Sequence, residues 1–289
     1  MPKTVLILGA SGRFGRNCAD AFAASGWQVR RFDRARDNLM QKAQDADVIV
    51  AGWNPAYPDW ADQVPKLHDQ IIQAALTADA TVILPGNVYV FGADTPAPWG
   101  ADTPHQAHNP LGMIRRRMEA AYRKAGVKTI LLRAGDYLDT TPSGNWFDMM
   151  MAKTLPKGAL TYPGNPDLDH AWAFLPDLAR AAVALSEQRD QLRRYEDIPF
   201  PGYTLSGRQI TTLLTETLQR PVKIRKMAWL PLHFLRPFMR LIPPLFEMRY
   251  LWNIPHSLTG TRFNELLPDF HPTPPKQALA AAVAHLHLT

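Results

Sequence analysis

Short runs of consecutive apolar residues alternate with longer amphipathic segments through the first half of the chain. Such runs are typical of strands that are buried on both faces of a parallel sheet. They lie at residues 4–8, 27–32, 48–51, 81–84 and 127–132. The segments between them have helical spacing, with one face formed by Phe14, Cys18, Ala21 and Phe22 in the first and by Val64, Leu67, Ile71, Ile72 and Ala75 in a later one. Strands alternating with helices predict right-handed βαβ units.

A further strand and helix are predicted at 170–175 and from about Asp177, whose carboxylate suits the positive end of a helix. The stretch 136–169 looks irregular. From Pro199 onward the alternation stops, and prolines interrupt short helices at 231, 237, 243, 244, 255 and 268. We therefore expect an α/β fold with a Rossmann-type doubly wound parallel sheet and a small C-terminal substrate lobe. The sheet domain would comprise 1–135 and 170–198, and the lobe 136–169 and 199–289.

A glycine loop, Gly9-Ala-Ser-Gly12-Arg-Phe-Gly15, joins the first strand to the first helix. Gly9 permits a tight turn, Gly12 lets a pyrophosphate approach the backbone, and Gly15 allows close packing of helix on strand. The helix N-terminus that follows offers free N–H donors and a partial positive charge to phosphates. This arrangement predicts a dinucleotide site.

Two neighbouring residues bear on the choice of dinucleotide. Asp33 ends the second strand, 18 residues after Gly15, where a carboxylate accepts hydrogen bonds from the adenosine ribose hydroxyls and favours NAD. Arg34 follows it and Arg13 lies in the loop, and either guanidinium could pair with the 2′-phosphate of NADP. The expected cofactor is NAD or NADP, with a slight preference for NAD.

Together with that loop and Asp33, several segments resemble the extended short-chain dehydrogenases/reductases, the NAD-dependent epimerase/dehydratase family. These segments are 47–51 before Asn54-Pro55, then 84–92, 132–135 and 170–179. The resemblance covers nearly the whole chain and implies hydride transfer with a bound nicotinamide dinucleotide. It implies a cofactor site built from Gly9, Ser11, Gly12, Arg13, Phe14, Gly15, Asp33, Arg34, Gly52, Asn54, Pro85 and Arg115.

The family's catalytic residues are a Ser or Thr after the fourth strand and a Tyr-x-x-x-Lys pair on a later helix. Alignment places Asn87, Leu111 and Arg115 at these positions, and none of the eight tyrosines has a lysine four residues on. Arg115 could still hydrogen-bond the cofactor ribose, and Asn87 could orient a carbonyl. Tyr89, two residues along the same segment, is the expected substitute acid, unless it is a core aromatic. The predicted catalytic set is Tyr89, Asn87 and Arg115, with Tyr137 and Asp136 as further candidates.

Two functions remain open at this point. The first is an NAD(P)-dependent oxidoreductase or epimerase/dehydratase-like protein that acts on a small molecule, such as a nucleotide-sugar or a carbonyl compound. The second is a non-catalytic NAD(P)-binding regulator or sensor similar to the nitrogen-metabolite repressor NmrA, whose relatives have lost the tyrosine. The missing Tyr-x-x-x-Lys pair favours the second, and the aromatic-rich lobe favours the first.

The formal net charge of +6 calls for an anionic partner, which a dinucleotide or phosphorylated substrate satisfies. No nucleic-acid recognition motif is present. Residues 223–249 carry six Lys/Arg and one acid among aromatic residues, but their prolines would break a membrane-surface helix. We expect this segment to line a substrate pocket. No secretory leader is recognised, so we expect a cytoplasmic protein, and a homodimer is what the resemblance implies.

The remaining candidate chemistry is weak. His105 and His108 form an H-x-x-H beside Asp102, but no further ligands accompany them, so we expect no metal site. His170 begins a strand, either as a partly buried residue or in contact with substrate. The single cysteine, Cys18, excludes an intramolecular disulfide.

Overall fold

Within residues 3–288, which the computed structural model describes, six parallel strands form the main sheet, in the order β2-β1-β3-β4-β5-β9. The chain builds outward from β1 to β2 and then crosses to the other side of β1, so the strand order reverses between β1 and β3. Ligands of such sheets bind at this reversal, outside the carboxyl ends of the strands. The strands are β1 (Thr4–Leu8), β2 (Gln28–Arg31), β3 (Val48–Ala51), β4 (Thr81–Gly86), β5 (Thr129–Arg133) and β9 (Tyr195–Pro199).

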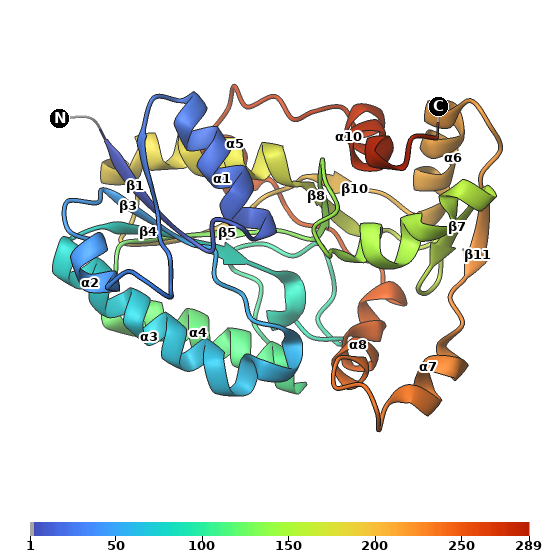
Figure 1. Cartoon of the computed structure of the whole chain (residues 1–289), viewed down its shortest axis with the longest axis horizontal. Coiled ribbons are helices and arrows are strands. Elements are labelled where there is room, and N and C mark those ends of the chain that lie inside the picture. The colour runs from blue at the N-terminus through green and yellow to red at the C-terminus, as the bar shows by residue number, and fades with distance from the viewer. Residues whose placement is uncertain (1–2, 289) are drawn as a thin grey trace.

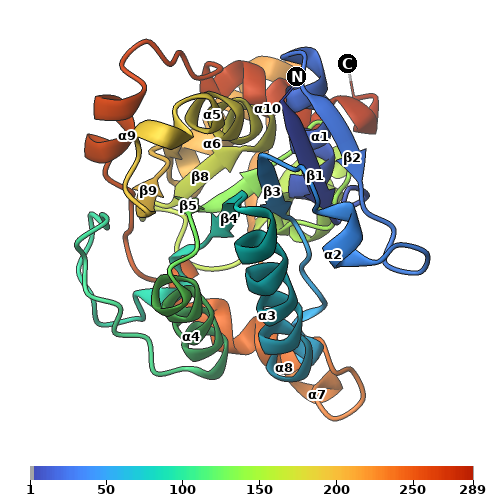
Figure 2. The ribbon, with the colours of Figure 1, turned by 90° about the vertical axis from the view of Figure 1, so that its left-hand side faces the viewer.

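Helices cover both faces of the main sheet (Figures 1 and 2). Residues of β1 alternate between the two core clusters, with Val5 and Ile7 facing α1 and α5 and with Leu6 and Leu8 facing α3 and α4. This alternation is why the strand must be apolar at every position. The helices are α1 (Arg13–Ala24), α5 (Leu175–Glu187), α3 (Trp60–Ala78), α4 (Pro110–Ala125) and the short α2 (Leu39–Lys42).

The predicted α/β fold with a doubly wound parallel sheet is confirmed. All five strands predicted in the first half are present, with ends that differ by at most a few residues. The predicted strand at 170–175 is also present as β8 (Ala171–Phe174), but it pairs with β6 (Asp136–Leu138) and β10 (Tyr203–Thr204) in a separate sheet. The sixth strand of the main sheet is instead β9, which the apolar pattern did not reveal.

A smaller lobe stands beside the carboxyl edge of the main sheet (Figure 1). It contains the β10-β8-β6 sheet, a two-stranded β11-β7 sheet and its own apolar core. Below these sheets, α7 and α8 project from the body of the molecule. The further elements are β7 (Ala159–Tyr162), β11 (Lys223–Lys226), α6 (Gly207–Leu218), α7 (Trp229–Leu235), α8 (Ile242–Glu247), α9 (Thr261–Leu266) and α10 (Pro275–Val283).

The stretch 136–169, which the sequence predicts to be irregular, contains β6, β7 and two helical segments at 147–151 and 152–157. Each is too short to show a hydrophobic period, and packing in the lobe core stabilises it. The prolines of the C-terminal region fall where a missing N–H costs little, since Pro243 and Pro244 occupy the first turn of α8. No helix of the described residues has the length and apolar character needed to span a membrane.

Candidate functional site

The glycine loop lies at the point where the strand order reverses. Gly9 follows β1 with a φ of +72°, and a Cβ on it would approach the carbonyl oxygen of Gly52, which follows β3, to 2.7 Å. A Cβ on Gly15 would lie 2.2 Å from the Gly9 carbonyl oxygen, so only glycine lets α1 begin this close to the strand. Gly12 precedes α1, and no side chain of the described residues caps the helix there. The first N–H groups of α1 therefore remain available to an anion.

An open groove runs from this loop to the end of β2. It is lined by the predicted cofactor residues Gly9, Ser11, Gly12, Asp33, Arg34, Gly52 and Asn54, together with Trp53 and Arg31. The carboxylate of Asp33 is half-exposed and accepts the N–H of Ala35 at 2.9 Å, which leaves acceptor positions toward the groove. Arg34 lines the same groove. Arg13 lies on the other side of the loop, where its Nη2 donates to the carbonyl of Gly144 at 2.9 Å.

Beyond the glycine loop the groove continues into a partly open cavity of about 240 Å³. Its wall brings together the ends of β3, β4 and β5 with the loop that follows β6. The three predicted catalytic residues all line it, as do the predicted cofactor residues Arg13, Phe14 and Pro85. Tyr137 and Asp136 line it too. Gly15 is the one predicted cofactor residue found on neither wall, because it is buried against Gly9.

Two tyrosines of the cavity wall are hydrogen-bonded to each other. The hydroxyl of Tyr89 lies 2.6 Å from the hydroxyl of Tyr57. Burial raises the pKa of Tyr57 above its ordinary value and that of Tyr89 well above it, so both phenols keep their protons at neutral pH. Tyr57 was not among the residues predicted from the sequence. Its only signal is that it follows β3 by six residues, at the edge where all these strands end.

Asn87 is fixed beside the tyrosine pair. Its side-chain oxygen accepts the N–H of Tyr89 at 3.1 Å, and its carbonyl accepts from Nη1 of Arg133 at 2.6 Å. The side-chain NH₂ of Asn87 has no partner among the described residues and can face a carbonyl oxygen in the cavity.

Arg115 is buried in the cavity wall. Its Nη2 donates to the carbonyl of Pro85, and the guanidinium lies 5.9 Å from the centre of the Trp60 ring. Burial lowers the pKa of Arg115 below its ordinary value. Its Nε is buried and finds no partner among residues 3–288. One turn earlier, at the position of the family's tyrosine, Leu111 is buried and its N–H donates to Glu247 at 2.6 Å.

The loop after β6 closes the cavity and is held to α1. Asp139 is buried and accepts from Arg16 at 2.8 and 2.9 Å and from the Asn17 amide at 3.2 Å. This attachment sets Asn145 and Trp146 on the cavity wall. The carboxylate of Asp136 points elsewhere, to Nε2 of His170 at 2.7 Å. His170 is buried and stacks on Trp252 with the ring centres 4.2 Å apart, so it supports the lobe from within.

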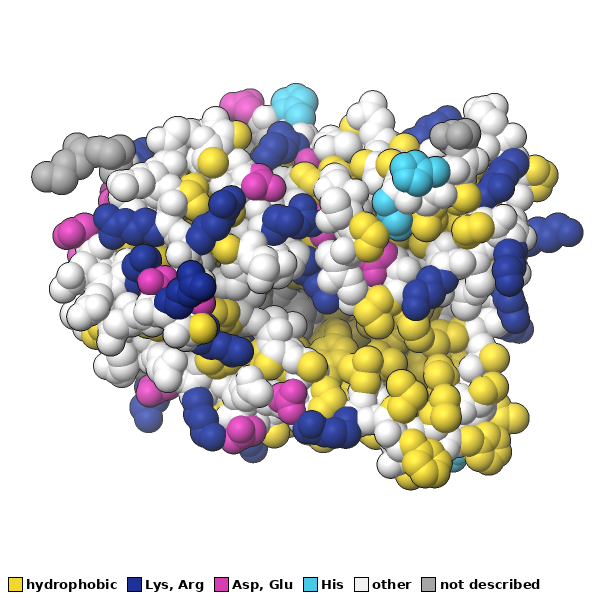
Figure 3. All heavy atoms as spheres, viewed as in Figure 1, with side chains coloured by type: hydrophobic (Ala, Val, Ile, Leu, Met, Phe, Trp, Pro, Cys, Tyr) yellow, Lys and Arg dark blue, Asp and Glu magenta, His cyan; other side chains and the backbone are white. Residues whose placement is uncertain are grey.

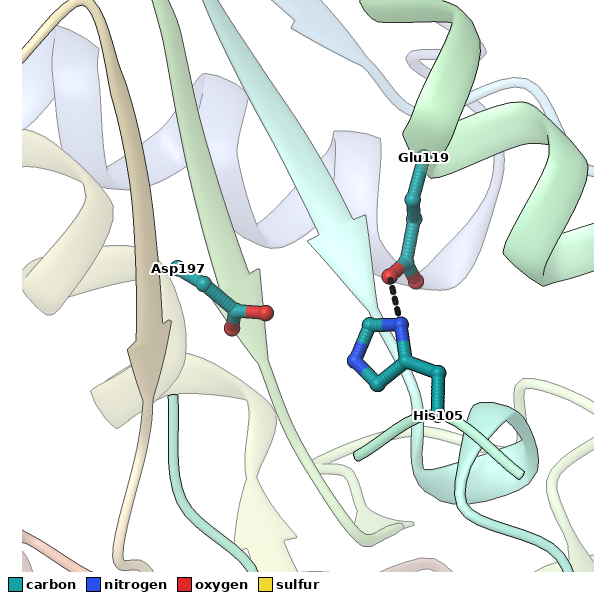
Figure 4. A group of neighbouring side chains, drawn as sticks. All are labelled: His105, Glu119 and Asp197. Atoms are coloured by element: carbon teal, nitrogen blue, oxygen red, sulfur yellow. Dashed lines mark ion pairs between the residues drawn. The ribbon is translucent and has the colours of Figure 1, made fainter. Parts of the chain in front are cut away.

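Figure 4 shows a second cluster of titratable side chains, His105, Glu119 and Asp197. Their donor atoms lie within 4.8 Å of one another, a spacing that a metal ion could bridge. The fully buried guanidinium of Arg133 already joins the two carboxylates, at 2.9 Å from Glu119 and 2.5 Å from Asp197. Burial and the charge of Arg133 lower the pKa of His105 to about 4, so this ring is neutral at pH 7. His108 is exposed and lies outside the cluster. The cluster is an ion-pair network in which the Arg133 guanidinium supplies the positive charge between the two carboxylates.

No family model and no curated protein matches this sequence. Solved structures with a similar fold include MoeE5 in complex with UDP-glucose and NAD, at 14% identity over 99% of this chain and 100% of that chain, with a TM-score of 0.73. The enzyme WbmH from Bordetella bronchiseptica in complex with NAD+ has 17% identity, 99% coverage of both chains and a TM-score of 0.72. A GalE-like L-threonine dehydrogenase from Cupriavidus necator has 19% identity, covers 99% of this chain and 100% of that chain, and has a TM-score of 0.74.

Two of these three structures are complexes with NAD or NAD+, and the third is named as a dehydrogenase. At such low identities the likeness establishes the fold, and every residue role must be argued from the chain itself.

Proposed function

We propose that this protein binds a nicotinamide dinucleotide along the groove and catalyses hydride transfer to or from a small molecule in the cavity. It would act as an NAD(P)-dependent oxidoreductase or epimerase/dehydratase-like enzyme. The observation that carries the proposal is the continuity of the glycine-loop groove with a cavity that contains two hydrogen-bonded, protonated tyrosines. A dinucleotide site and an acid for the substrate oxygen are thus parts of one surface.

The residues present fit the proposed cofactor. The space beside Gly9 and Gly52 would be filled by a single Cβ, the start of α1 is uncapped, and the buried Nε of Arg115 lacks a partner within the described part of the chain. These features suit a pyrophosphate at the helix N-terminus and a hydroxyl-bearing group beside Arg115. Asp33 would accept the adenosine ribose hydroxyls, which favours NAD, and two of the structural neighbours were crystallised with NAD or NAD+.

When bound, the dinucleotide supplies or accepts the hydride. Tyr89 would hold the proton that moves to or from the substrate oxygen, and Tyr57 would stabilise its hydroxyl and connect it to further proton carriers. The free NH₂ of Asn87 would orient the substrate carbonyl. Because both phenols are protonated at neutral pH, the pair can donate a proton there but cannot accept one.

One observation favours the second candidate, a non-catalytic dinucleotide-binding sensor. The family's tyrosine position holds Leu111, which has no proton to transfer, and its backbone N–H is bonded to Glu247 of the lobe. A sensor would bind dinucleotide without turnover of any substrate. The tyrosine pair lines the cavity and so supports the enzyme, although Tyr89 also belongs to the buried core.

Calorimetric titration of the purified protein with NAD+, NADP+, NADH and NADPH tests the proposal, after any copurified cofactor has been identified. We expect saturable binding of one redox pair, followed by turnover in a screen of dinucleotide oxidation with carbonyl compounds and nucleotide-sugars. Absence of binding to all four would overturn both candidates. Binding without turnover of any compound would favour the sensor.

Asp33 is expected to determine the choice between NAD and NADP. In Asp33→Ala the ribose loses two hydrogen bonds to a charged acceptor, so NAD should bind about 10- to 100-fold more weakly. NADP should be affected less, because Arg34 and Arg31 line the same groove. Calorimetry on the variant checks this, with Asp69→Ala as the matched control, since Asp69 is exposed and outside the groove. Equal weakening of both dinucleotides would show that Asp33 does not distinguish the ribose of NAD from that of NADP.

A further inference from the structure

A second chamber of about 250 Å³ adjoins the catalytic cavity. The two share Arg13, Asn54, Tyr57, Asn145 and Trp146 as parts of their walls. Tyr57 lines both spaces, and its hydroxyl is bonded to that of Tyr89. A substrate whose oxygen reaches Tyr89 would place its remaining atoms in this chamber.

The rest of the chamber wall comes from two segments of the lobe. Met149 and Met150 belong to the helical segment after Trp146. Leu245 lies in α8, and Leu241 directly precedes that helix. Trp146 and Leu245 are buried, so they form a fixed apolar floor. Methionine side chains are flexible and polarizable, and they adapt to apolar ligands of different shape.

The chamber offers little to a charged substrate. Arg13 is the only charged side chain on its wall within the described residues, and its Nη2 already donates to the carbonyl of Gly144. The nearby Arg240 is paired with Asp59 at 2.9 Å. A nucleotide diphosphate carries several anionic oxygens that need cations or N–H donors when they leave water. An alkyl or aryl group needs none.

The same lobe segment is apolar outside the chamber. Leu230, Phe234 and Phe238 are 69%, 68% and 82% exposed, and all lie on α7 or in the turn that leads to α8. Figure 3 shows hydrophobic side chains gathered over this part of the molecule and along the hollow beside it. An apolar compound would therefore meet an apolar surface before it reaches the chamber.

We propose that the substrate is an apolar carbonyl compound, an alkyl or aryl aldehyde or ketone, or the corresponding alcohol. This inference rests on the proposed function. In the reducing direction the carbonyl carbon takes the hydride, its oxygen takes the proton of Tyr89, and the reduced dinucleotide becomes oxidised. Solvent restores the proton of Tyr89. The apolar part of the substrate occupies the chamber between Trp146 and Leu245.

The first test compares straight-chain aldehydes from butanal to octanal with UDP-glucose as substrates of the full chain. Burial of one methylene contributes about 0.8 kcal/mol, so kcat/KM should rise about fourfold for each methylene that enters the chamber. UDP-glucose should show no turnover. Turnover of UDP-glucose with no dependence on aldehyde length would overturn the apolar substrate and leave the proposed hydride transfer intact.

A pair of matched variants tests whether the dependence of kcat/KM on aldehyde length arises in the chamber. Met150→Gln makes one wall of the chamber polar at nearly constant size, whereas Met239→Gln makes the same change at a residue that is 49% exposed outside the chamber. We expect Met150→Gln to lower kcat/KM for octanal about tenfold and for butanal by less, with dinucleotide affinity unchanged. Met239→Gln should have no effect. Equal effects of the two variants would contradict the assignment of the chamber.

A binding measurement that needs no turnover distinguishes failure of the apolar site from failure of the proposed hydride transfer. 1-Octanol is titrated into the protein, with tryptophan fluorescence as the readout, because Trp146 lines the chamber. Binding that is weakened by Met150→Gln, together with no turnover of any carbonyl, would support the apolar chamber and contradict the proposed hydride transfer. No binding of 1-octanol to the wild-type protein would overturn the apolar site.

Discussion

Tyr89→Phe is expected to lower the rate of carbonyl reduction by about 100- to 10,000-fold, the usual contribution of a positioned general acid. Dinucleotide affinity should not change, because the hydroxyl of Tyr89 is bonded to Tyr57 and not to the glycine loop. The measurement is kcat/KM with the best substrate of the screen, beside calorimetry of the cofactor. The variant keeps the buried ring, so a general loss of stability is not expected to account for the result.

Two further tyrosine variants serve as controls for Tyr89→Phe. Tyr57→Phe removes one hydrogen bond from the pair but keeps the acid, so its loss should be about 2- to 10-fold. Tyr137→Phe alters another cavity tyrosine, whose pKa burial raises to about 12, and should have the smallest effect. Full activity in Tyr89→Phe would remove Tyr89 from the mechanism. A larger loss in Tyr137→Phe would transfer the acid to that residue.

The pKa of Tyr89 also predicts how the two directions of the reaction depend on pH. Burial raises this pKa well above its ordinary value, so the phenol that donates the proton stays fully populated between pH 6 and pH 9. Reduction should not lose its acid across that range. Oxidation needs the phenolate as base, so its rate should rise about tenfold per pH unit. A fall of the reduction rate between pH 6 and pH 9 would indicate a different, more acidic donor.

The sequence predicted those strands whose residues are apolar throughout. The strand β9 shows why a buried strand can lack such an apolar run. Two of its five residues, Glu196 and Asp197, are acids, yet both are buried. Arg262 pairs with Glu196 at 2.7 Å and Arg133 with Asp197 at 2.5 Å, and both partners come from distant parts of the chain. A strand made compatible with the core by such ion pairs has no hydrophobic signature. The strands β7 and β11 escaped for another reason, because each has only four residues, they pair with each other, and β11 is mostly exposed.

In the candidate site, too, some residues could be predicted from the sequence and others could not. The glycine loop and Asp33 could be predicted because their meaning lies in a local pattern of a turn between a strand and a helix. The pairing of Tyr57 with Tyr89 could not, because it depends on how the segments after β3 and β4 turn at the sheet edge. The contact of Glu247 with the N-terminus of α4 joins residues 136 positions apart. The lobe chamber is likewise formed by segments that meet only in the folded chain.

Arg133→Met is expected to lower the free energy of unfolding at pH 7 by about 3 to 5 kcal/mol. The guanidinium is fully buried, bonds to Glu119, Asp197 and the carbonyl of Asn87, and lies 5.2 Å from the Phe91 ring. Methionine fills much of the space but leaves two buried carboxylates without a cation. Urea denaturation measures the loss, with the exposed Arg193→Met as the matched control.

The pH dependence distinguishes this cause from a simple packing defect. Burial raises the pKa of Asp197 even with Arg133 present, and without Arg133 this pKa should rise further above its unfolded value. Groups with a raised folded-state pKa destabilise the folded state as pH rises through that pKa, because the charged form must be buried. The deficit of Arg133→Met should therefore shrink between pH 7 and pH 4.5. Adding Glu119→Gln and Asp197→Asn to Arg133→Met should recover stability at pH 7. If the loss of stability is independent of pH and persists in this triple variant, packing and not charge makes Arg133 necessary.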